Sequence, residues 1–382
     1  MPETGIAVLG AGGRGKLLTS HLLACGPDIK VKSVFEPCSD TLRRTLADWP
    51  PQHPRICRNY QEAIETPGVD WVLVASPNAF HKEEIVAAFD CGKDVFSEKP
   101  LAINIPDCLA IDEAYRRSGR RFGIGFVLRY APLYRRAKEL LAAGEIGDII
   151  SISGSENIAP AHGSYMVRSW RRFADIGGPH VLEKCCHDLD LLNWFIGDLP
   201  ARVAAFGGLN FFTDKYKSLM GKYHRSNGVD VFVNEWEVEQ GIEIKSPFEI
   251  RKDLMDNLVS ILEYRNGVRV QFQTTMSNAL PERRMYISGT EGTMVVEAYT
   301  SKLLVKRLDE EGFRQMNFAG EGHNGGDQAT VDDWYRAIVE QRPPACSGAS
   351  GVDSSIIALA LDQACREKRI VDLEPIWRGL GR

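Results

Sequence analysis

The stretch Gly5-Ile6-Ala7-Val8-Leu9-Gly10-Ala11-Gly12-Gly13-Arg14-Gly15 decides the fold of this chain. Its apolar first half predicts a strand, and an amphipathic helix is expected from about Lys16 to Ala24. The glycines between them allow a tight turn, close approach of the backbone to a pyrophosphate, and close helix–strand packing. The helix N-terminus offers free N–H groups to the phosphates. The pattern therefore predicts a dinucleotide site that uses Gly10, Gly12, Gly13, Arg14 and Gly15.

A second strand is predicted over residues 31–35, and Glu36 follows it directly. An acidic side chain about 20 residues beyond the glycines accepts hydrogen bonds from the adenosine ribose and repels a 2'-phosphate. Glu36 therefore favours NAD over NADP as the cofactor.

Strands and helices continue to alternate through residue 126, with further strands over 71–75, 94–98 and 122–126. This alternation predicts an α/β Rossmann domain over residues 1–126, a doubly wound parallel sheet that binds ligands at its carboxyl edge. After the strand over 71–75, that edge carries Ser76, Asn78 and His81.

Glu98-Lys99-Pro100 follows another of these strands, and we interpret Lys99 as the chemical centre. A parallel strand delivers the residue at its carboxyl end into the ligand crevice, and proline stops the strand there. The alternative is a surface turn with a fortuitous Glu-Lys pair.

Beyond residue 127 the pattern predicts an α+β domain over 127–382 with a large, mostly antiparallel open sheet. Turns such as Arg265-Asn266-Gly267 join consecutive strands directly. Residues 208–252 break the regularity, and we interpret them as an insertion over the cleft or at a subunit contact. The predicted strands are 148–157, 257–264, 268–276, 283–288 and 293–298.

A helix is predicted from Pro179 to about Ile196. One face carries an apolar stripe, and another carries Glu183, His187 and Asp190 at helical spacing. We interpret His187 as a proton acceptor, oriented by a carboxylate such as Glu183. The alternative is a solvated polar face.

The stretch 165–172 before this helix is expected to be a loop and holds Arg168, Trp170, Arg171 and Arg172. Guanidinium groups bind oxyanions in a bidentate way, so the cluster fits an anionic sugar. A surface charge cluster or contacts to the cofactor phosphates are the alternatives.

Composition narrows the possible partners of the chain. The 382 residues include 46 basic and 51 acidic side chains, a net charge of -5, which recruits neither nucleic acid nor an anionic membrane. Apolar runs stay below the length of a spanning helix, the amino terminus lacks a signal-peptide pattern, and cytoplasmic residence is expected. The nine cysteines, including Cys185-Cys186, are interpreted as reduced thiols with no metal site.

Several motifs together resemble the glucose-fructose oxidoreductase and inositol dehydrogenase (Gfo/Idh/MocA) family. The resemblance implies that Lys99 and His187 are the catalytic residues and that the chain is a homo-dimer or homo-tetramer through its C-terminal sheet. Glu183 departs from the aspartate that many members carry four residues before the histidine. The matching motifs are the glycine loop, Ser76-Pro77-Asn78 with His81, Glu98-Lys99-Pro100, Arg129 with Pro132, His187 with Asp190, and the glycine-rich segment that starts at His323.

Removing a hydride from an alcohol carbon requires a base at its hydroxyl. The first hypothesis is therefore an NAD-dependent dehydrogenase for a ring hydroxyl of a sugar, sugar derivative or cyclitol. The second is an NAD-dependent glycoside hydrolase that oxidises the sugar transiently, because Lys184 and Asp188 add ionisable groups beside His187. The third, a sensor without catalysis, has no use for Lys99 and His187. Arg168, Trp170, Arg171, Lys184, Asp188 and His323 are the expected substrate contacts, with Lys99 and His187.

Overall fold

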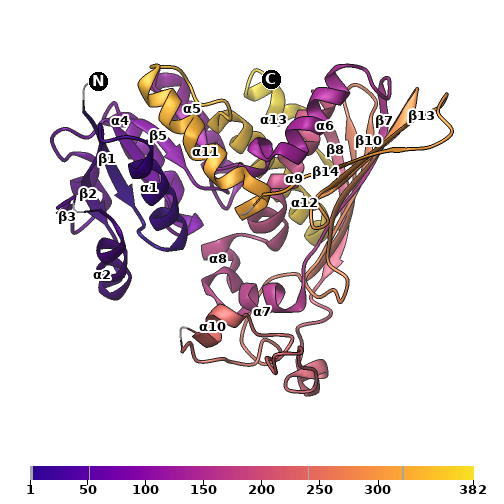
Figure 1. Cartoon of the computed structure of the whole chain (residues 1–382), viewed down its shortest axis with the longest axis horizontal. Coiled ribbons are helices and arrows are strands. Elements are labelled where there is room, and N and C mark those ends of the chain that lie inside the picture. The colour runs from indigo at the N-terminus through magenta and orange to yellow at the C-terminus, as the bar shows by residue number, and fades with distance from the viewer. Residues whose placement is uncertain (1–2, 51, 240, 321) are drawn as a thin grey trace. The chain divides into compact units, whose positions relative to one another are not determined.

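The computed structural model describes residues 3–50, 52–239, 241–320 and 322–382, which form two compact units (Figure 1). The first unit comprises residues 1–132 and 320–356, and the second comprises residues 133–319 and 357–382. The sequence pattern placed the boundary after residue 126 and treated everything beyond it as one domain. The structure differs because a late segment of the chain packs with the first unit.

The first unit contains the expected parallel sheet, with strand order β3-β2-β1-β4-β5-β6. Its central strands are buried on both faces, as their continuous apolar sequences require. The two-residue strand β3 was not predicted, because so short a run has no readable period. The strands are β1 Thr4–Leu9, β2 Ile29–Phe35, β3 Arg55–Ile56, β4 Trp71–Val74, β5 Asp94–Ser97 and β6 Phe122–Ile124.

Helices cover this sheet, and one of them comes from the returning segment. In α11 (Gly322–Val339), Trp334 stacks on Phe96 of β5 with ring centroids 4.4 Å apart and meets the edge of Trp71. Leu18 and Leu22 of α1 belong to the same core. This burial explains why residues 320–356 belong to the first unit. Its other helices are α1 Gly13–Cys25, α2 Ser39–Asp48, α3 Tyr60–Ile64, α4 His81–Asp90, α5 Ile105–Ser118 and the first part of α12 Gly348–Glu367, with the 3-10 turns η1 Asn78–Phe80 and η2 Val127–Tyr130.

The second unit is built on a nine-stranded sheet with order β14-β13-β12-β11-β7-β10-β9-β8-β15. Most neighbours are antiparallel, as expected, but β7 and β10 pair in parallel. Four of its strands, β8, β13, β14 and β15, were not predicted. The strands are β7 Ile149–Asn157, β8 Pro200–Gly208, β9 Asn257–Tyr264, β10 Arg269–Thr275, β11 Glu282–Gly289, β12 Gly292–Glu297, β13 Lys302–Arg307, β14 Arg314–Asn317 and β15 Val371–Asp372.

Residues 208–252 contain little regular structure and form a satellite core of the second unit. Phe212, Phe232 and Phe248 pack there against Met166 and Val167 of α7. The stretch 165–172 is therefore helical rather than a loop. The helical segments of this unit are α6 Pro132–Ala142, α7 Pro160–Arg168, η3 Trp170–Arg172, α8 Ala174–Gly177, α9 His180–Ile196, η4 Asp214–Leu219, α10 Glu235–Glu239, the rest of α12, and α13 Glu374–Gly379.

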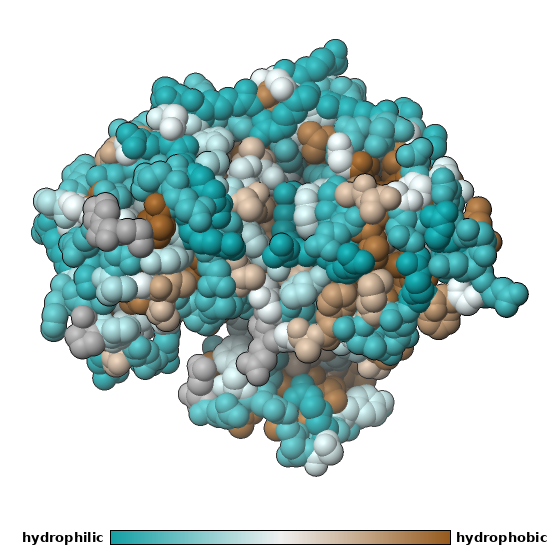
Figure 2. All heavy atoms as spheres, turned by 45° about the horizontal axis from the view of Figure 1, so that its top comes forward, coloured by the Kyte–Doolittle hydropathy of each residue, from teal (hydrophilic) through white to brown (hydrophobic). Residues whose placement is uncertain are grey.

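One face of the nine-stranded sheet carries exposed apolar side chains. Strand β9 alternates buried Leu258 and Leu262 with exposed Val259 and Ile261, and Phe206 of β8 is 78% exposed beside Val259. Elsewhere the face of the molecule in Figure 2 is mostly hydrophilic. Among the described residues, the helices are all too short or too polar to cross a bilayer.

Candidate active site

The glycine loop has the geometry that a dinucleotide pyrophosphate requires. Gly10 has φ +86°, and a Cβ there would lie 2.5 Å from the backbone nitrogen of Ser76. A Cβ on Gly15 would lie 2.0 Å from the carbonyl oxygen of Gly10. By contrast, a Cβ on Gly12 or Gly13 would meet open space. Since Gly12 caps α1 without a side chain, the helix N-terminus is left open for phosphate oxygens, and these residues fit NAD.

Glu36 lies at the end of β2, where the ribose contact was expected. Its carboxylate accepts the N–H of Ala11 at 2.9 Å and the N–H of Cys38 at 2.9 Å. These two hydrogen bonds fix the Glu36 carboxylate against the glycine loop.

Beyond β4, the expected cofactor residues have partners within the protein. The Ser76 hydroxyl donates to Glu84 at 2.7 Å, and the two ring nitrogens of His81 lie 2.7 and 2.8 Å from the carbonyl oxygens of Ser76 and Pro100. Asn78 is buried. The His81 ring thus joins the segments that follow β4 and β5, and the Ser76 side chain joins the first of them to α4. Burial raises the pKa of Glu84 to about 8, although the Ser76 hydrogen bond opposes the shift.

Lys99 follows β5 and is half-buried, next to a fixed carboxylate. Glu98 accepts the Lys99 N–H at 3.2 Å and the Arg14 Nε–H at 2.9 Å. Arg14 also donates to Asp327 at 2.8 Å. Burial opposes the charge of Arg14, but the two carboxylates outweigh it and raise its pKa. The Arg14 side chain is therefore engaged by the protein, while its backbone remains part of the loop.

Two further residues that the family resemblance assigned also belong to the first unit. Arg129 is half-buried in η2, where its N–H donates to the Phe126 carbonyl at 3.0 Å. His323 is exposed, and its Nδ1 lies 2.9 Å from Asp327. The Asp327 carboxylate thus joins His323 to Arg14.

In the second unit, α9 runs from His180 to Ile196, close to the predicted helix from Pro179 to about Ile196. Its polar face is buried, with Glu183, His187 and Asp190 exposed by only 5%, 6% and 1%. The interpretation of this face as solvated is therefore wrong. Ionisable groups that remain this deeply buried are candidates for acid–base chemistry.

Arg171 fixes Glu183, which lies one helical turn before His187. Its Nε donates to Glu183 at 2.6 Å and its Nη1 donates to the Tyr165 hydroxyl at 3.0 Å. The guanidinium also lies 4.2 Å from the ring centroid of Trp170. Burial opposes the charge of Arg171, but Glu183 raises its pKa.

The arginines around α7 do not share one anion site. Arg168 has a side chain only 7% exposed, and it pairs with Glu237 at 2.6 Å and donates to the Phe232 carbonyl. Arg172 donates to two main-chain carbonyls. The pairing with Glu237 and the burial of Arg168 both argue against the substrate contact expected of it, which stays a prediction. Arg168 anchors residues 208–252.

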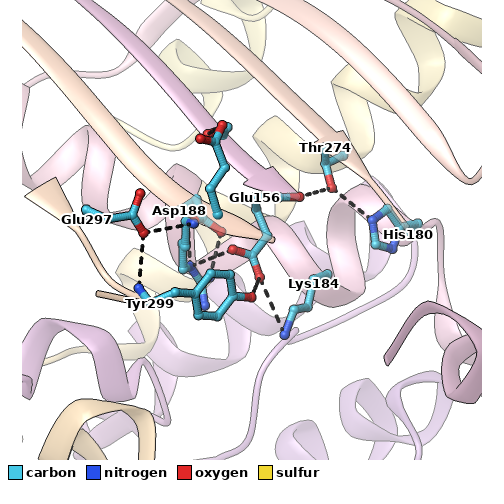
Figure 3. A network of polar contacts seen from close by, with 10 residues as sticks. Glu156, His180, Lys184, Asp188, Thr274, Glu297 and Tyr299 are labelled. Carbon is cyan, nitrogen blue, oxygen red and sulfur yellow. Dashed lines mark hydrogen bonds and ion pairs between the residues drawn. The ribbon is translucent and has the colours of Figure 1, made fainter. Parts of the chain in front are cut away.

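Asp188 and Lys184 belong to a buried network shown in Figure 3. Arg283 donates to Asp188 at 2.8 and 2.6 Å and lies 3.2 Å from Glu156. The Lys184 ammonium lies 3.6 Å from Glu156, and the Tyr299 hydroxyl donates to the same carboxylate at 3.4 Å. Burial raises the pKa of Glu156, although Arg283 and Lys184 oppose the shift.

Asp188 is bound to Arg283 and has 0% exposure, which argues against its expected substrate contact. Arg283 and Glu156 of this network were not predicted from the sequence. Both occupy the inward-facing positions of alternating strands, and a charged residue in that register signals a buried partner.

Comparison with known proteins agrees with this architecture. A family model described as "Oxidoreductase family, NAD-binding Rossmann fold" matches residues 4–126, and the model of its C-terminal alpha/beta domain matches residues 138–373. An inositol 2-dehydrogenase of Gluconacetobacter diazotrophicus is 30% identical over 50% of this chain and 54% of its own length. A 2,7-anhydro-N-acetylneuraminate hydratase of Escherichia coli is 31% identical over 37% of each chain. The solved structure of levoglucosan dehydrogenase with NADH and levoglucosan superposes with a TM-score of 0.78 at 19% identity, over 97% of this chain and 99% of that one.

Proposed function

The chain belongs to the Gfo/Idh/MocA oxidoreductase family and is an NAD-binding oxidoreductase of the sugar and cyclitol type, and from this we propose that it oxidises a ring hydroxyl of a sugar or cyclitol. NAD, when bound, would be the hydride acceptor. The observation that carries the proposal is the burial of Glu183 and His187 one helical turn apart on α9, with Glu183 held by Arg171.

In this proposal, His187 accepts the proton of the substrate hydroxyl as the hydride leaves the same carbon. A base is needed because the alcohol becomes a carbonyl only when both the hydride and the proton depart. Glu183, fixed by Arg171, favours the protonated imidazole that results, and Lys99 stabilises negative charge that develops on the oxygen.

The second candidate is glycoside cleavage through transient oxidation of the sugar. It draws support from the relative that is named a hydratase, and from the many ionisable groups on α9. Two of these ionisable groups have partners inside the protein, since Asp188 is bound by Arg283 and Lys184 lies beside Glu156. The dehydrogenase therefore remains the better supported candidate.

Measuring reduced cofactor separates the two reactions. The protein is incubated with myo-inositol, scyllo-inositol, D-glucose and the methyl glucosides, with NAD in excess or in trace amounts. We expect NADH to accumulate in proportion to added NAD, and turnover to stop after one equivalent when NAD is scarce. Free sugar released over many turnovers without NADH would instead establish the hydrolase.

A further inference from the structure

Arg14 joins three segments of the first unit. Its backbone lies in the glycine loop, while its guanidinium donates to Glu98 beside Lys99 and to Asp327 in α11. Both carboxylates are nearly buried, with side chains 7% and 11% exposed. An arginine fork that holds two buried carboxylates at once fixes both in position, because each loses a charge-assisted hydrogen bond if the fork moves.

The structure around Glu98 is shaped for this contact. The Lys99 N–H donates to the second oxygen of the Glu98 carboxylate at 3.2 Å, so the acid also holds the main chain of Lys99. A Cβ at Gly125 would lie 3.0 Å from the first oxygen, Oε1. Glycine at position 125 therefore leaves room for the carboxylate to lie between Arg14 and the Lys99 backbone.

Asp327, the second carboxylate bound by Arg14, contacts a turn of left-handed residues over 323–325. His323, Asn324 and Gly325 have φ values of 47°, 57° and 84°. This left-handed conformation is uncommon for residues with a Cβ, although Asn and His adopt it more often than most. The His323 ring contacts Asp327 at 2.9 Å. The Arg14–Asp327 ion pair thus fixes the carboxylate that contacts the His323 ring of the turn.

We propose that Arg14 is a positioning residue that couples NAD binding in the glycine loop to the Lys99 main chain and to the His323–Gly325 turn. A pyrophosphate bound by the loop fixes the Arg14 backbone, and the guanidinium passes this restraint to Glu98 and Asp327. By linkage, stabilising the turn must also favour NAD binding. The part of the proposal that concerns Lys99 rests on the proposed function.

Hydrogen–deuterium exchange with and without NAD tests the coupling and needs no substrate. In the natural protein, we expect NAD to slow amide exchange at least about fivefold in peptides covering residues 96–101 and 323–327, the lower end of common coupling factors. In Arg14→Met both peptides should lose this protection, while the glycine loop keeps it. In Asp327→Asn, which leaves the loop intact, only residues 323–327 should lose it.

Arg121→Met is the matched control. Arg121 pairs at 2.5 Å with Asp94, which begins β5, whereas Glu98 follows the end of that strand. Removing the Arg121 guanidinium should therefore lower stability without changing NAD-linked protection. Arg14→Lys should restore part of the protection, since an ammonium keeps one ion pair. Unchanged protection of residues 323–327 in both Arg14→Met and Asp327→Asn would overturn the proposal. Full turnover in Lys99→Met would refute the role of Lys99 and leave the coupling intact.

Discussion

Arg283 and Asp188 form a bidentate ion pair in the interior of the second unit, with both side chains at most 7% exposed. Arg283 reaches from β11 to α9, the helix that carries His187. Removing one partner of a buried pair leaves an uncompensated charge, which typically costs about 3–5 kcal/mol. We therefore expect Arg283→Met to lower the thermal midpoint strongly.

The exposed pair Arg43–Asp40 provides the control for this prediction. Arg43→Met should change stability by less than about 0.5 kcal/mol, since exposed pairs contribute little. Scanning calorimetry of both variants compares them directly. Equal midpoints would show that the buried pair does not hold α9 to the sheet.

Glu36 should set the cofactor preference. NAD is expected to bind at least about tenfold more tightly than NADP, a difference of about 1.4 kcal/mol, because the carboxylate repels a 2'-phosphate. Glu36→Gln keeps the shape of the side chain but loses its charge, so the ratio of NAD affinity to NADP affinity should decrease. Calorimetric titration of the natural protein and the variant with both cofactors measures this ratio. Tighter binding of NADP to the natural protein would remove Glu36 from this role.

Lys99→Met and His187→Ala should each lower turnover by about two orders of magnitude or more, the scale of a positioned acid–base group. NAD affinity should survive in His187→Ala, because His187 lies outside the unit that carries the glycine loop. His180→Asn on the same helix is the control, since His180 is buried against Thr274. That variant should lose stability and keep most of its turnover; near-normal turnover in His187→Ala would contradict the proposed base.

Glu84 should make stability depend on pH. Its pKa in the folded protein is about 8, above the ordinary 4.5, because burial disfavours the carboxylate. The unfolded chain therefore releases this proton first, and stability is lost as pH rises from about 4.5 to about 8. A tenfold difference in proton affinity between the folded and unfolded chains corresponds to about 1.4 kcal/mol of stability.

Thermal midpoints at pH 6 and pH 8.5 test this loss of stability, which we expect to be on the order of a few kcal/mol. Glu84→Gln should lose less stability across the interval than the natural protein does. Glu113→Gln, at an exposed position of α5, should behave like the natural protein. If all three proteins lost stability in parallel, Glu84 would already be ionised in the fold.

The open face of the nine-stranded sheet should contact a second copy of the chain, as the expected oligomer requires. Phe206 and Ile261 are 78% and 60% exposed on adjacent strands. Burying such side chains favours association by about 25 cal/mol per Å². Phe206→Asp with Ile261→Asp should shift the sedimentation coefficient toward the monomer. Leu308→Asp, exposed outside these two strands, should leave it unchanged.

Local pattern determined most of the first unit. The strand–glycine–helix stretch, the acid at position 36 and the strand that ends at Lys99 are all legible in sequence, because hydrophobic period and turn residues act over short distances. Helix 180–196 was also predictable, with its proline start and glycine end.

Tertiary structure alone decided which distant side chains meet. Trp334 enters the core of the first unit, Arg168 pairs with a carboxylate 69 positions away, and Asp188 pairs with an arginine 95 positions away. A charged residue at an inward-facing position predicts that a partner exists. The identity of the partner depends on how the strands and helices pack. For that reason Arg168, which was expected in an anion site, is paired inside the protein, and the polar face of α9 is buried.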